Sequence, residues 1–287
     1  MKKFFEKYKP KYIFILGLFF TASLAWFAVY GAGRGTLQVV FLDVGQGDAI
    51  FVETPEGVQV LIDGGPNKSV LGELSEVMPF YDRSIDAVVL THPHLDHVGG
   101  LVEVLKRYEV GYAVESGAGH SIAEFAEWHN LLEKMGVAKV QARRGLRLEL
   151  GGGILLDFLL PEKMEESDDP HKNMAVSRLS YGRTCFLFTG DMERELEWRI
   201  LEDNIGCQVL KVGHHGSKTS TSDAFLEAVK PDFAVISAGR ANRYGHPNEA
   251  ILEKLGASGA KVFRTDIAGT IFMESDGKEI SASRNSL

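Results

Sequence analysis

The segment HPHLDH, residues 92–97, brings three histidines and an aspartate within six positions of one another. It directly follows an apolar run typical of a buried strand, and loops at strand ends place ligands on a rigid scaffold. In an extended loop, His92 and His94 can direct two imidazoles at one cation, while Asp96 and His97 can serve a second cation close by. Imidazoles combined with a carboxylate suit a borderline divalent ion such as Zn(II) or Mn(II). The segment therefore predicts a metal centre with room for two ions.

Other residues able to bind a metal or a substrate also follow apolar runs. Asp191 ends such a run, where its carboxylate is suited to bridging two cations or, alternatively, to capping the helix that follows. His214 and His215 end another run, and one of the two is expected to reach the second metal. His246 follows a third run, and it could donate a proton to a leaving oxygen, contact a phosphate or replace His215 as a ligand.

The chain is acidic, which restricts how it can bind a polyanion. Its 287 residues include 31 Lys and Arg against 39 Asp and Glu, a net charge of −8. Residues 1–33 hold five lysines and one glutamate, so the remaining 254 residues carry a net charge of −12. A broad basic footprint for nucleic acid is therefore excluded, and phosphate binding depends on local groups such as Ser217, Lys218 and Arg243. Ser217 is equally suited to capping the predicted helix 222–229.

The N-terminal part predicts a membrane anchor. Residues 12–33 contain no charged side chain, and about 20 apolar residues in a helix span a bilayer core of ~30 Å. The basic segment 1–11 precedes the span, so the positive-inside rule places it in the cytoplasm and residues 34–287 outside. Cleavage after residues 31–33 is the alternative. We therefore expect a single-pass protein of the cell membrane whose body is extracellular or periplasmic.

The body, residues 34–287, predicts an α/β fold in one domain. Apolar runs of strand length alternate with helical stretches such as 193–204, antiparallel runs flank the alternation, and no internal repeat interrupts it. This order favours two mixed sheets sandwiched between helices. The glycine-rich segment 43–48 is interpreted as a tight turn that supports the metal-binding loop, with phosphate binding as the alternative. Cys185 and Cys207 start apolar runs and are interpreted as buried thiols.

Several segments together resemble a known family. The order of HPHLDHVGG (92–100), the earlier DGG (63–65) and the later FTGD (188–191) resembles that of the motifs of the metallo-β-lactamase fold superfamily. A narrower likeness is to the extracellular hydrolase domain of the ComEC family of DNA-uptake proteins. The segments that carry it are LDVGQGDAI (42–50), LKVGHHGSKTSTS (210–222), AVISAGRANRYGHP (234–247) and RTDIAGTI (264–271). In place of that family's multi-helix channel, the sequence offers a single predicted span.

The resemblance implies an αββα sandwich of two mixed sheets, preceded by one transmembrane helix, and a centre of two divalent ions, Zn(II) or Mn(II). Its implied metal ligands are His92, His94 and Asp191 for one ion, and Asp96, His97, Asp191 and His215 for the other. His215 is preferred over His214 because it directly precedes the Gly-Ser turn. The implied catalytic residues are Asp96, as proton acceptor, and His246, and the implied substrate contacts are His214, Asn173 and Ser217.

One stretch departs from the superfamily pattern. Many members supply a third histidine to the first ion shortly before the bridging aspartate, but residues 169–174 here resemble the asparagine-rich segment of ComEC proteins, with Asn173 fitting that pattern. The first ion is therefore expected to have only His92, His94 and Asp191, with an open position or a water.

The resemblance favours a membrane-anchored phosphodiesterase or nuclease that acts outside the cell, on single-stranded DNA or on smaller phosphodiesters. It implies channel or uptake proteins as partners. Two other classes stay open: another hydrolase of the same fold, such as a lactonase, a thioesterase or a phosphorylcholine-type esterase, and a non-catalytic component of a DNA-uptake or envelope assembly. The complete set of histidines and aspartate in residues 92–97 argues against the non-catalytic class.

Overall fold

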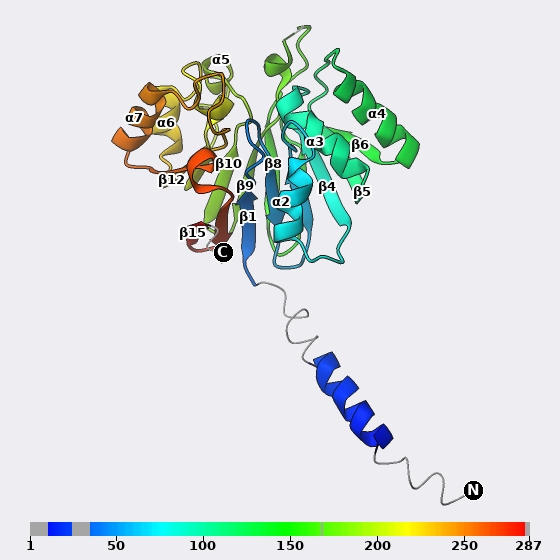
Figure 1. Ribbon diagram of the computed structural model, residues 1–287. Helices are drawn as coiled ribbons and strands as arrows, with labels where there is room; N and C mark the ends of the chain where they lie inside the picture. The colour runs from blue at the N-terminus through cyan, green and yellow to red at the C-terminus, as the bar shows by residue number, and fades with distance from the viewer. Residues whose placement is uncertain (1–10, 25–34, 168, 285–287) are drawn as a thin grey trace, which may run out of the picture. The chain divides into compact units, whose positions relative to one another are not determined.

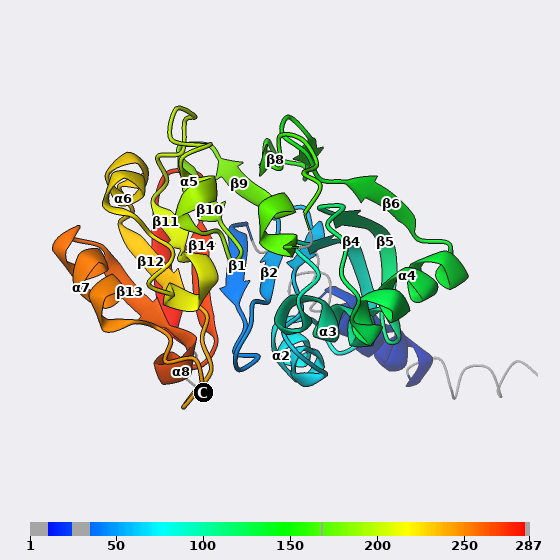
Figure 2. The ribbon, with the colours of Figure 1, turned by 90° about the horizontal axis from the view of Figure 1, so that it is seen from above.

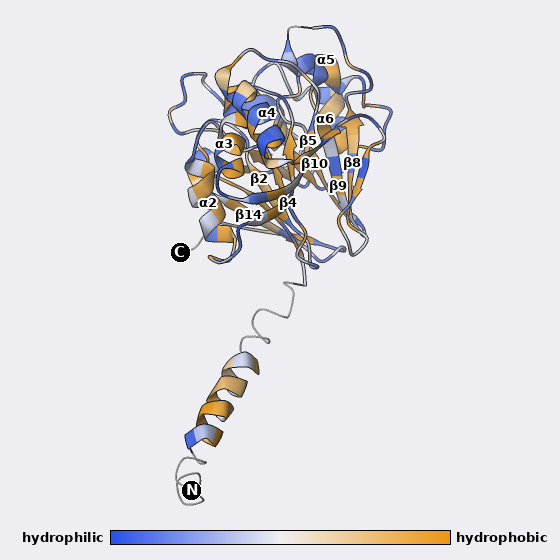
Figure 3. Ribbon diagram, turned by 90° about the vertical axis from the view of Figure 1, so that its right-hand side faces the viewer, coloured by the Kyte–Doolittle hydropathy of each residue, from blue (hydrophilic) through white to orange (hydrophobic). Residues whose placement is uncertain are grey.

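The computed structural model describes residues 11–24, 35–167 and 169–284. The chain divides into two compact units at residue 35, and each is described by itself. In the first unit, residues 11–24 are helical, with exposed and mostly apolar side chains (Figure 3). Among the described residues, no helix combines the length and the apolar character needed to cross a membrane. Residues 1–10 and 25–33, which belong to the predicted basic segment and span, lie outside the described residues.

The first sheet of the second unit has eight described strands in the order β15-β14-β1-β2-β3-β4-β5-β6. The pairs between β15 and β3 are antiparallel and those between β3 and β6 are parallel, so the sheet is mixed. The strands are β1 Leu37–Phe41, β2 Ile50–Glu53, β3 Gln59–Ile62, β4 Ser84–Leu90, β5 Glu109–Glu115, β6 Ala138–Gln141, β14 Ile271–Ser275 and β15 Ile280–Arg284.

The second sheet has seven described strands in the order β13-β12-β11-β10-β9-β8-β7. It is parallel from β13 to β10 and antiparallel from β10 to β7. The strands are β7 Arg147–Glu149, β8 Leu155–Leu160, β9 Val176–Tyr181, β10 Thr184–Phe188, β11 Val209–Lys211, β12 Phe233–Ile236 and β13 Lys261–Arg264. Every residue of β10 is buried, as expected of a central strand covered on both faces.

Helices cover the outer face of each sheet, so the body is an αββα sandwich (Figures 1 and 2). On the first sheet lie α2 Ser69–Val77, α3 Leu95–Leu105 and α4 Ala123–Met135; on the second lie α5 Arg194–Glu197, α6 Asp223–Val229 and α7 Glu249–Ala257, and the short α8 Thr265–Ala268 follows β13. Three buried apolar layers hold these parts together, one between the sheets and one beneath each set of helices. The prediction of an α/β fold with two mixed sheets between helices is confirmed.

The connections after β1, β3, β4, β10 and β11 meet at one edge of the sandwich. The strands β1, β3 and β4 run in one direction, so their carboxyl ends share an edge, and the same holds for β10 and β11. Close backbone contacts fix α3 there. A Cβ on Gly100 would lie 1.8 Å from the carbonyl oxygen of Gly64, so only glycine, which has no Cβ, fits at this position. This packing seats the start of α3 on the turn after β3.

Two predictions about local structure are wrong. The helix expected over 193–204 is only α5, because the following hydrogen bonds are mostly those of tighter turns, such as Arg199 N–H to Leu196 O. The buried carboxylate of Glu197 also accepts a hydrogen bond from the backbone N–H of Ser222 at 2.9 Å, which fixes the chain at the end of α5. The cysteines are not thiols: Cys185 and Cys207 form a disulfide, with Cα atoms 5.1 Å apart. It joins β10 to the segment that enters β11.

We predict that this disulfide contributes measurably to stability. Its two residues are 22 positions apart in sequence, and cross-linking a loop of that length stabilises a fold by about 3 kcal/mol through the unfolded state. Urea unfolding of Cys207→Ser should show that loss relative to the oxidised protein. The double variant Cys185→Ser/Cys207→Ser is the control, because its stability should not respond to reductant. Equal stability of the oxidised and reduced proteins would contradict the prediction.

Candidate metal centre

The loop after β4 places the first histidines at the edge of the sandwich. His92 is fully buried, and His94 caps α3 in an extended conformation, so that Asp96 and His97 lie in the first turn of that helix. The segment between the strand and the helix is thus short and pinned at both ends. Its side chains converge because the helix turns Asp96 and His97 back toward the strand end.

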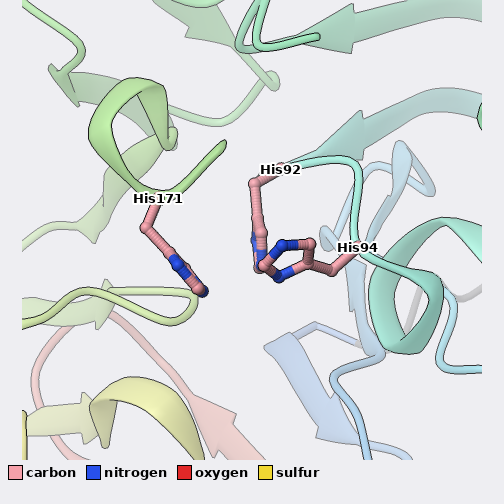
Figure 4. Close-up of side chains that lie close together, drawn as sticks. All are labelled: His92, His94 and His171. Carbon is pink, nitrogen blue, oxygen red and sulfur yellow. The ribbon is translucent and has the colours of Figure 1, made fainter. Parts of the chain in front are cut away.

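His92, His94 and His171 form one cluster of possible ligands. One nitrogen from each lies within 4.8 Å of the others, and Figure 4 shows the His171 ring facing the two rings of the β4 loop. His171 lies in the 3-10 turn Pro170–Asn173, where its Nδ1 is 3.0 Å from an oxygen of Asp169. Its Nε2 is buried and has no hydrogen-bond partner among the described residues. A divalent cation between the three rings would satisfy this atom.

The sequence predicts an open position or a water in this cluster, and the structure brings His171 there instead. His171 lies in residues 169–174, the stretch where the superfamily often has a third histidine. The sequence prediction assigned a role in this stretch to Asn173 only. The structure turns Asn173 away from the cluster: it is buried, its Oδ1 accepts from the N–H of Glu165 at 2.7 Å and its amide donates to the Glu165 oxygen. Asn173 therefore holds the loop that carries His171.

Asp96, His97, Asp191 and His215 form the second cluster. The Nε2 of His215 is 3.3 Å from Oδ2 of Asp96 and 3.4 Å from Oδ1 of Asp191, and the Nε2 of His97 is 3.4 Å from Oδ2 of Asp191. Both Nε2 atoms and Oδ1 of Asp191 are buried without a hydrogen-bond partner among the described residues. Buried polar atoms rarely stay unpaired, so this donor set also fits a divalent cation.

The two clusters adjoin at Asp191. Its Oδ2 is 3.9 Å from Nε2 of His92 in the first cluster and 3.4 Å from Nε2 of His97 in the second. Asp191 follows β10, and Gly190 before it has a φ of 51°, which turns the carboxylate toward both groups. A carboxylate between two sets of imidazoles is placed to bridge two cations.

Hydrogen bonds behind the imidazoles fix how they are presented. The Nδ1 of His97 is 2.8 Å from Oδ2 of Asp63, and the Nδ1 of His215 is 2.9 Å from the carbonyl oxygen of Ser237. The backbone N–H and the hydroxyl of Thr91 both donate to Asp63. With Nδ1 engaged in this way, each ring directs Nε2 at the second cluster, the arrangement usual for metal-binding histidines.

The histidines of the two clusters differ in charge. Burial lowers the pKa of His94 to about 4, and burial likewise lowers the pKa of His92, so both rings are neutral at pH 7. For His97 and His215, burial acts in the same direction, but the neighbouring carboxylates together outweigh it and raise the pKa of each well above the usual range: Asp191 and Asp63 act on His97, and Asp191, Asp48 and Asp96 act on His215. In the absence of metal, the second cluster therefore holds protonated imidazoles.

The pKa values of Asp96 and Asp191 are lowered, in contrast to those of His97 and His215. Burial alone would raise the pKa of Asp96, but its close contact with the protonated ring of His215 and the charge of His97 lower it to about 2. The pKa of Asp191 is also held well below its usual range, because His215 and His97 outweigh its burial. Both carboxylates are therefore ionised at neutral pH and available to a cation.

A buried lysine lies beneath the second cluster, and the sequence analysis did not predict it. Lys211, in β11, is fully buried; its ammonium forms an ion pair with Asp48, donates to the carbonyl oxygen of Gly190 at 2.8 Å and is 3.9 Å from Oδ1 of Asp191. The other oxygen of Asp48 is 3.4 Å from Nδ1 of His215. This pair connects the glycine-rich loop at 43–48 to two of the predicted ligands.

The other residues predicted for the site lie at different places. His214 reaches the centre as well, with Nε2 3.8 Å from Oδ2 of Asp191 and Nδ1 3.1 Å from Glu193. His246 is half-buried, its ring 5.8 Å from that of His214, and belongs to neither ligand cluster. Ser217 is buried, and its hydroxyl is 2.9 Å from that of Thr219, which places it within the turn; Ser222, not Ser217, caps α6.

A cavity of about 320 Å³ opens above the two clusters. His94, Asp96, His171, Asp191, His214 and His215 form part of its lining, together with Gln46, Leu95, His120, Ile122, Tyr244 and His246. Its size lies at the low end of the range for small-molecule sites, so it accommodates one compact chemical group at a time.

Comparison with known proteins identifies the family. A sequence model described as the metallo-beta-lactamase superfamily matches residues 42–240. The chain belongs to this superfamily. ComE operon protein 3 of Bacillus subtilis (strain 168) is 34% identical over 253 residues, which are 82% of this chain and 32% of that protein. Competence protein ComA of Neisseria gonorrhoeae is 33% identical over 245 residues, 81% of this chain and 31% of that protein.

These relatives confirm the predicted likeness to competence proteins. The chain spans only about a third of their length. Solved structures support the fold. The metallo-beta-lactamase fold protein YhfI from Bacillus subtilis superposes with a TM-score of 0.58 at 12% identity, covering 84% of this chain and all of that one. Igni18, a metallo hydrolase from the archaeon Ignicoccus hospitalis, gives 0.53 at 19% identity, covering 82% and 98% of the two chains.

We predict that the candidate metal centre releases protons when it takes up metal at neutral pH. His97 and His215 carry raised pKa values, and a cation can bind Nε2 only after its proton leaves, so about two protons per chain should be released. Affinity should consequently rise with pH. Calorimetric titration with Zn(II) in two buffers of different ionisation enthalpy measures the number of protons released per chain. His215→Ala should reduce it to about one, and an enthalpy independent of the buffer would contradict the prediction.

Proposed function

We propose that this chain is a metal-dependent phosphodiesterase, anchored in the cell membrane with its body outside, that holds two divalent ions, Zn(II) or Mn(II). The observation that carries the proposal is the pair of ligand clusters that adjoin at Asp191. His92, His94 and His171 would hold one ion, and Asp96, His97 and His215 the other, with Asp191 between them. His214 would contact the substrate or complete the first ion's ligand set.

Two cations held by these residues would supply Lewis acidity and an activated water to the hydrolysis of a phosphodiester. The residues of the chain orient and move the protons. Asp96, whose side chain is 32% exposed and lines the cavity, would accept a proton from the attacking water. His246 also lines the cavity; burial lowers its pKa, so it would contact the substrate as a neutral hydrogen-bonding ring. That protonation state favours holding a phosphate oxygen over donating a proton to the leaving group.

The likeness to competence proteins favours a phosphodiester over the esters of other superfamily members. The cavity supports this choice, because two cations held by its lining residues would attract an anionic substrate. Single-stranded DNA or smaller phosphodiesters would be the substrates, and channel or uptake proteins the partners. A lactonase, thioesterase or phosphorylcholine-type esterase is the second class, which a substrate panel separates from the first.

The external location rests on two features. The helical residues 11–24 expose apolar side chains, as a segment that lies in lipid does. The Cys185–Cys207 disulfide is typical of proteins that fold in an oxidising compartment such as the periplasm or the cell exterior.

We predict that the second cluster is required for hydrolysis. His97→Ala should lower bound metal toward one ion per chain and abolish turnover. Asp96→Asn should keep the fold and lower kcat by about 10²–10⁴, because it removes the proton acceptor while preserving the shape of the side chain. Metal content by plasma mass spectrometry and turnover of bis-aryl phosphodiesters and oligonucleotides with Mn(II) or Zn(II) test this. Asn67→Ala, at an exposed asparagine outside the cavity that opens above the two clusters, is the matched control.

Turnover of a lactone or thioester with no cleavage of any phosphodiester would replace the proposed function by the second class. Full metal content and full turnover in His97→Ala would remove the ligand assignment itself.

We also predict that the body is accessible from outside intact cells. Protease added to intact cells should degrade residues 34–287, because the lysines of the first eleven residues orient the anchor with its N-terminus inside. A cytoplasmic protein followed in the same samples is the control for cell integrity. Protection of the body in intact cells, together with its digestion after lysis, would disprove this topology.

A further inference from the structure

The mouth of the cavity carries an aromatic wall that the proposed chemistry does not require. Tyr244 and His246 both line the cavity, their ring planes are inclined by only 15°, and the ring centres are 6.1 Å apart. Tyr244 is 55% exposed, so its ring is accessible at the mouth of the cavity. The guanidinium of Arg243 lies over the Tyr244 ring at 5.0 Å and donates to its hydroxyl, so the ring is already oriented.

A single asparagine fixes the loop that carries these rings. The amide of Asn242 donates to the carbonyl oxygens of Gly239 and His246, and its Oδ1 accepts from the backbone N–H groups of Tyr244 and His246. The loop also rests on the histidine-bearing turn, since a Cβ on Gly216 would lie 2.6 Å from Pro247. The aromatic wall therefore has a fixed position relative to the metal ligands before any substrate arrives.

Two nearby cations are engaged in holding this loop. The Nε of Arg240 donates to the carbonyl oxygen of Asp266 at 3.0 Å, and Arg243 is bound to Tyr244. With a body of net charge −12, binding by phosphate contacts alone has little support here. Flat aromatic rings offer a different source of affinity, because nucleobases stack on them whatever their sequence.

We propose that Tyr244 and His246 form a subsite for one unpaired nucleobase next to the scissile phosphate. The inference rests on the proposed phosphodiesterase function and names the part of the substrate that the site recognises. A cavity of about 320 Å³ suits one base and its sugar, whereas the bases of a duplex are stacked against their neighbours and are not free to enter. The subsite therefore selects single strands over duplexes, with little preference among bases.

Binding of oligonucleotides to the full-length chain tests the subsite independently of cleavage. The probes are a single strand, the same strand built entirely of abasic sugars, and the corresponding duplex, each with a fluorophore for anisotropy. Tyr244→Ala should weaken binding of the single strand about tenfold and leave the abasic strand and the duplex unchanged. Tyr244→Phe should keep wild-type binding, because it preserves the ring. Tyr81→Ala, at an exposed tyrosine that does not line the cavity, is the control.

In turnover measurements, the same loss should appear in KM for the single strand, with kcat changed less than about twofold. An equal loss of binding on strands with and without bases would overturn the subsite, as would a Tyr244→Phe variant as weak as Tyr244→Ala. Failure of the proposed function gives a different result: no phosphodiester is cleaved by the wild type, while the binding comparison still decides whether the aromatic wall recognises bases.

Discussion

Four aspartates converge at one edge of the sandwich: Asp48, Asp63, Asp96 and Asp191. In a poorly solvated site their negative charges repel one another, and the surrounding structure must offset this repulsion. A buried carboxylate is tolerated only when it is paired. Each of the four has a cationic or hydrogen-bonding partner: Lys211 for Asp48, His97 and Thr91 for Asp63, His215 for Asp96, and both histidines for Asp191. The fold thus holds these charges together by means of protons and one ammonium group, and a bound cation would take the place of the protons.

The backbone at this edge is shaped by the same requirement. Asp63, His214 and His215 have positive φ values of 57°, 47° and 54°, a conformation that residues with a Cβ rarely adopt. Such strain persists where surrounding contacts hold it, and it collects at functional sites. Here the turn after β3 is held by α3, and the turn after β11 is held by the loop that ends at Pro247.

Much of this centre could be predicted from the sequence because its chemistry is local. His92, His94, Asp96 and His97 lie on one loop beside an apolar run, so their proximity needs no knowledge of the fold. Lys211 is the opposite case: it lies within an apolar run, and its partner Asp48 is brought to it only by the packing of the two sheets against each other.

His171 and the disulfide escaped prediction for a similar reason. His171 follows an acidic, turn-rich segment and not an apolar run, so nothing in the local pattern directs it at the β4 loop. Cys185 and Cys207 meet because β10 and β11 pair in parallel, in a register that the spacing of the cysteines does not reveal. The alternation of strands and helices, which depends on short-range patterns, was predicted more completely than these long-range contacts.

The ligands are drawn from widely separated parts of the chain, from His92 on the first sheet to His215 on the second, with Asp191 between them. No fragment that emerges early in synthesis contains both clusters, so the complete set of candidate ligands is assembled only once the two sheets have docked. A chain that crosses a membrane unfolded would therefore arrive empty and select its ions from the compartment in which it folds. Because divalent metals compete for such sites largely through their availability, the ions in the mature centre would record that compartment and not the cytoplasm in which the chain was made.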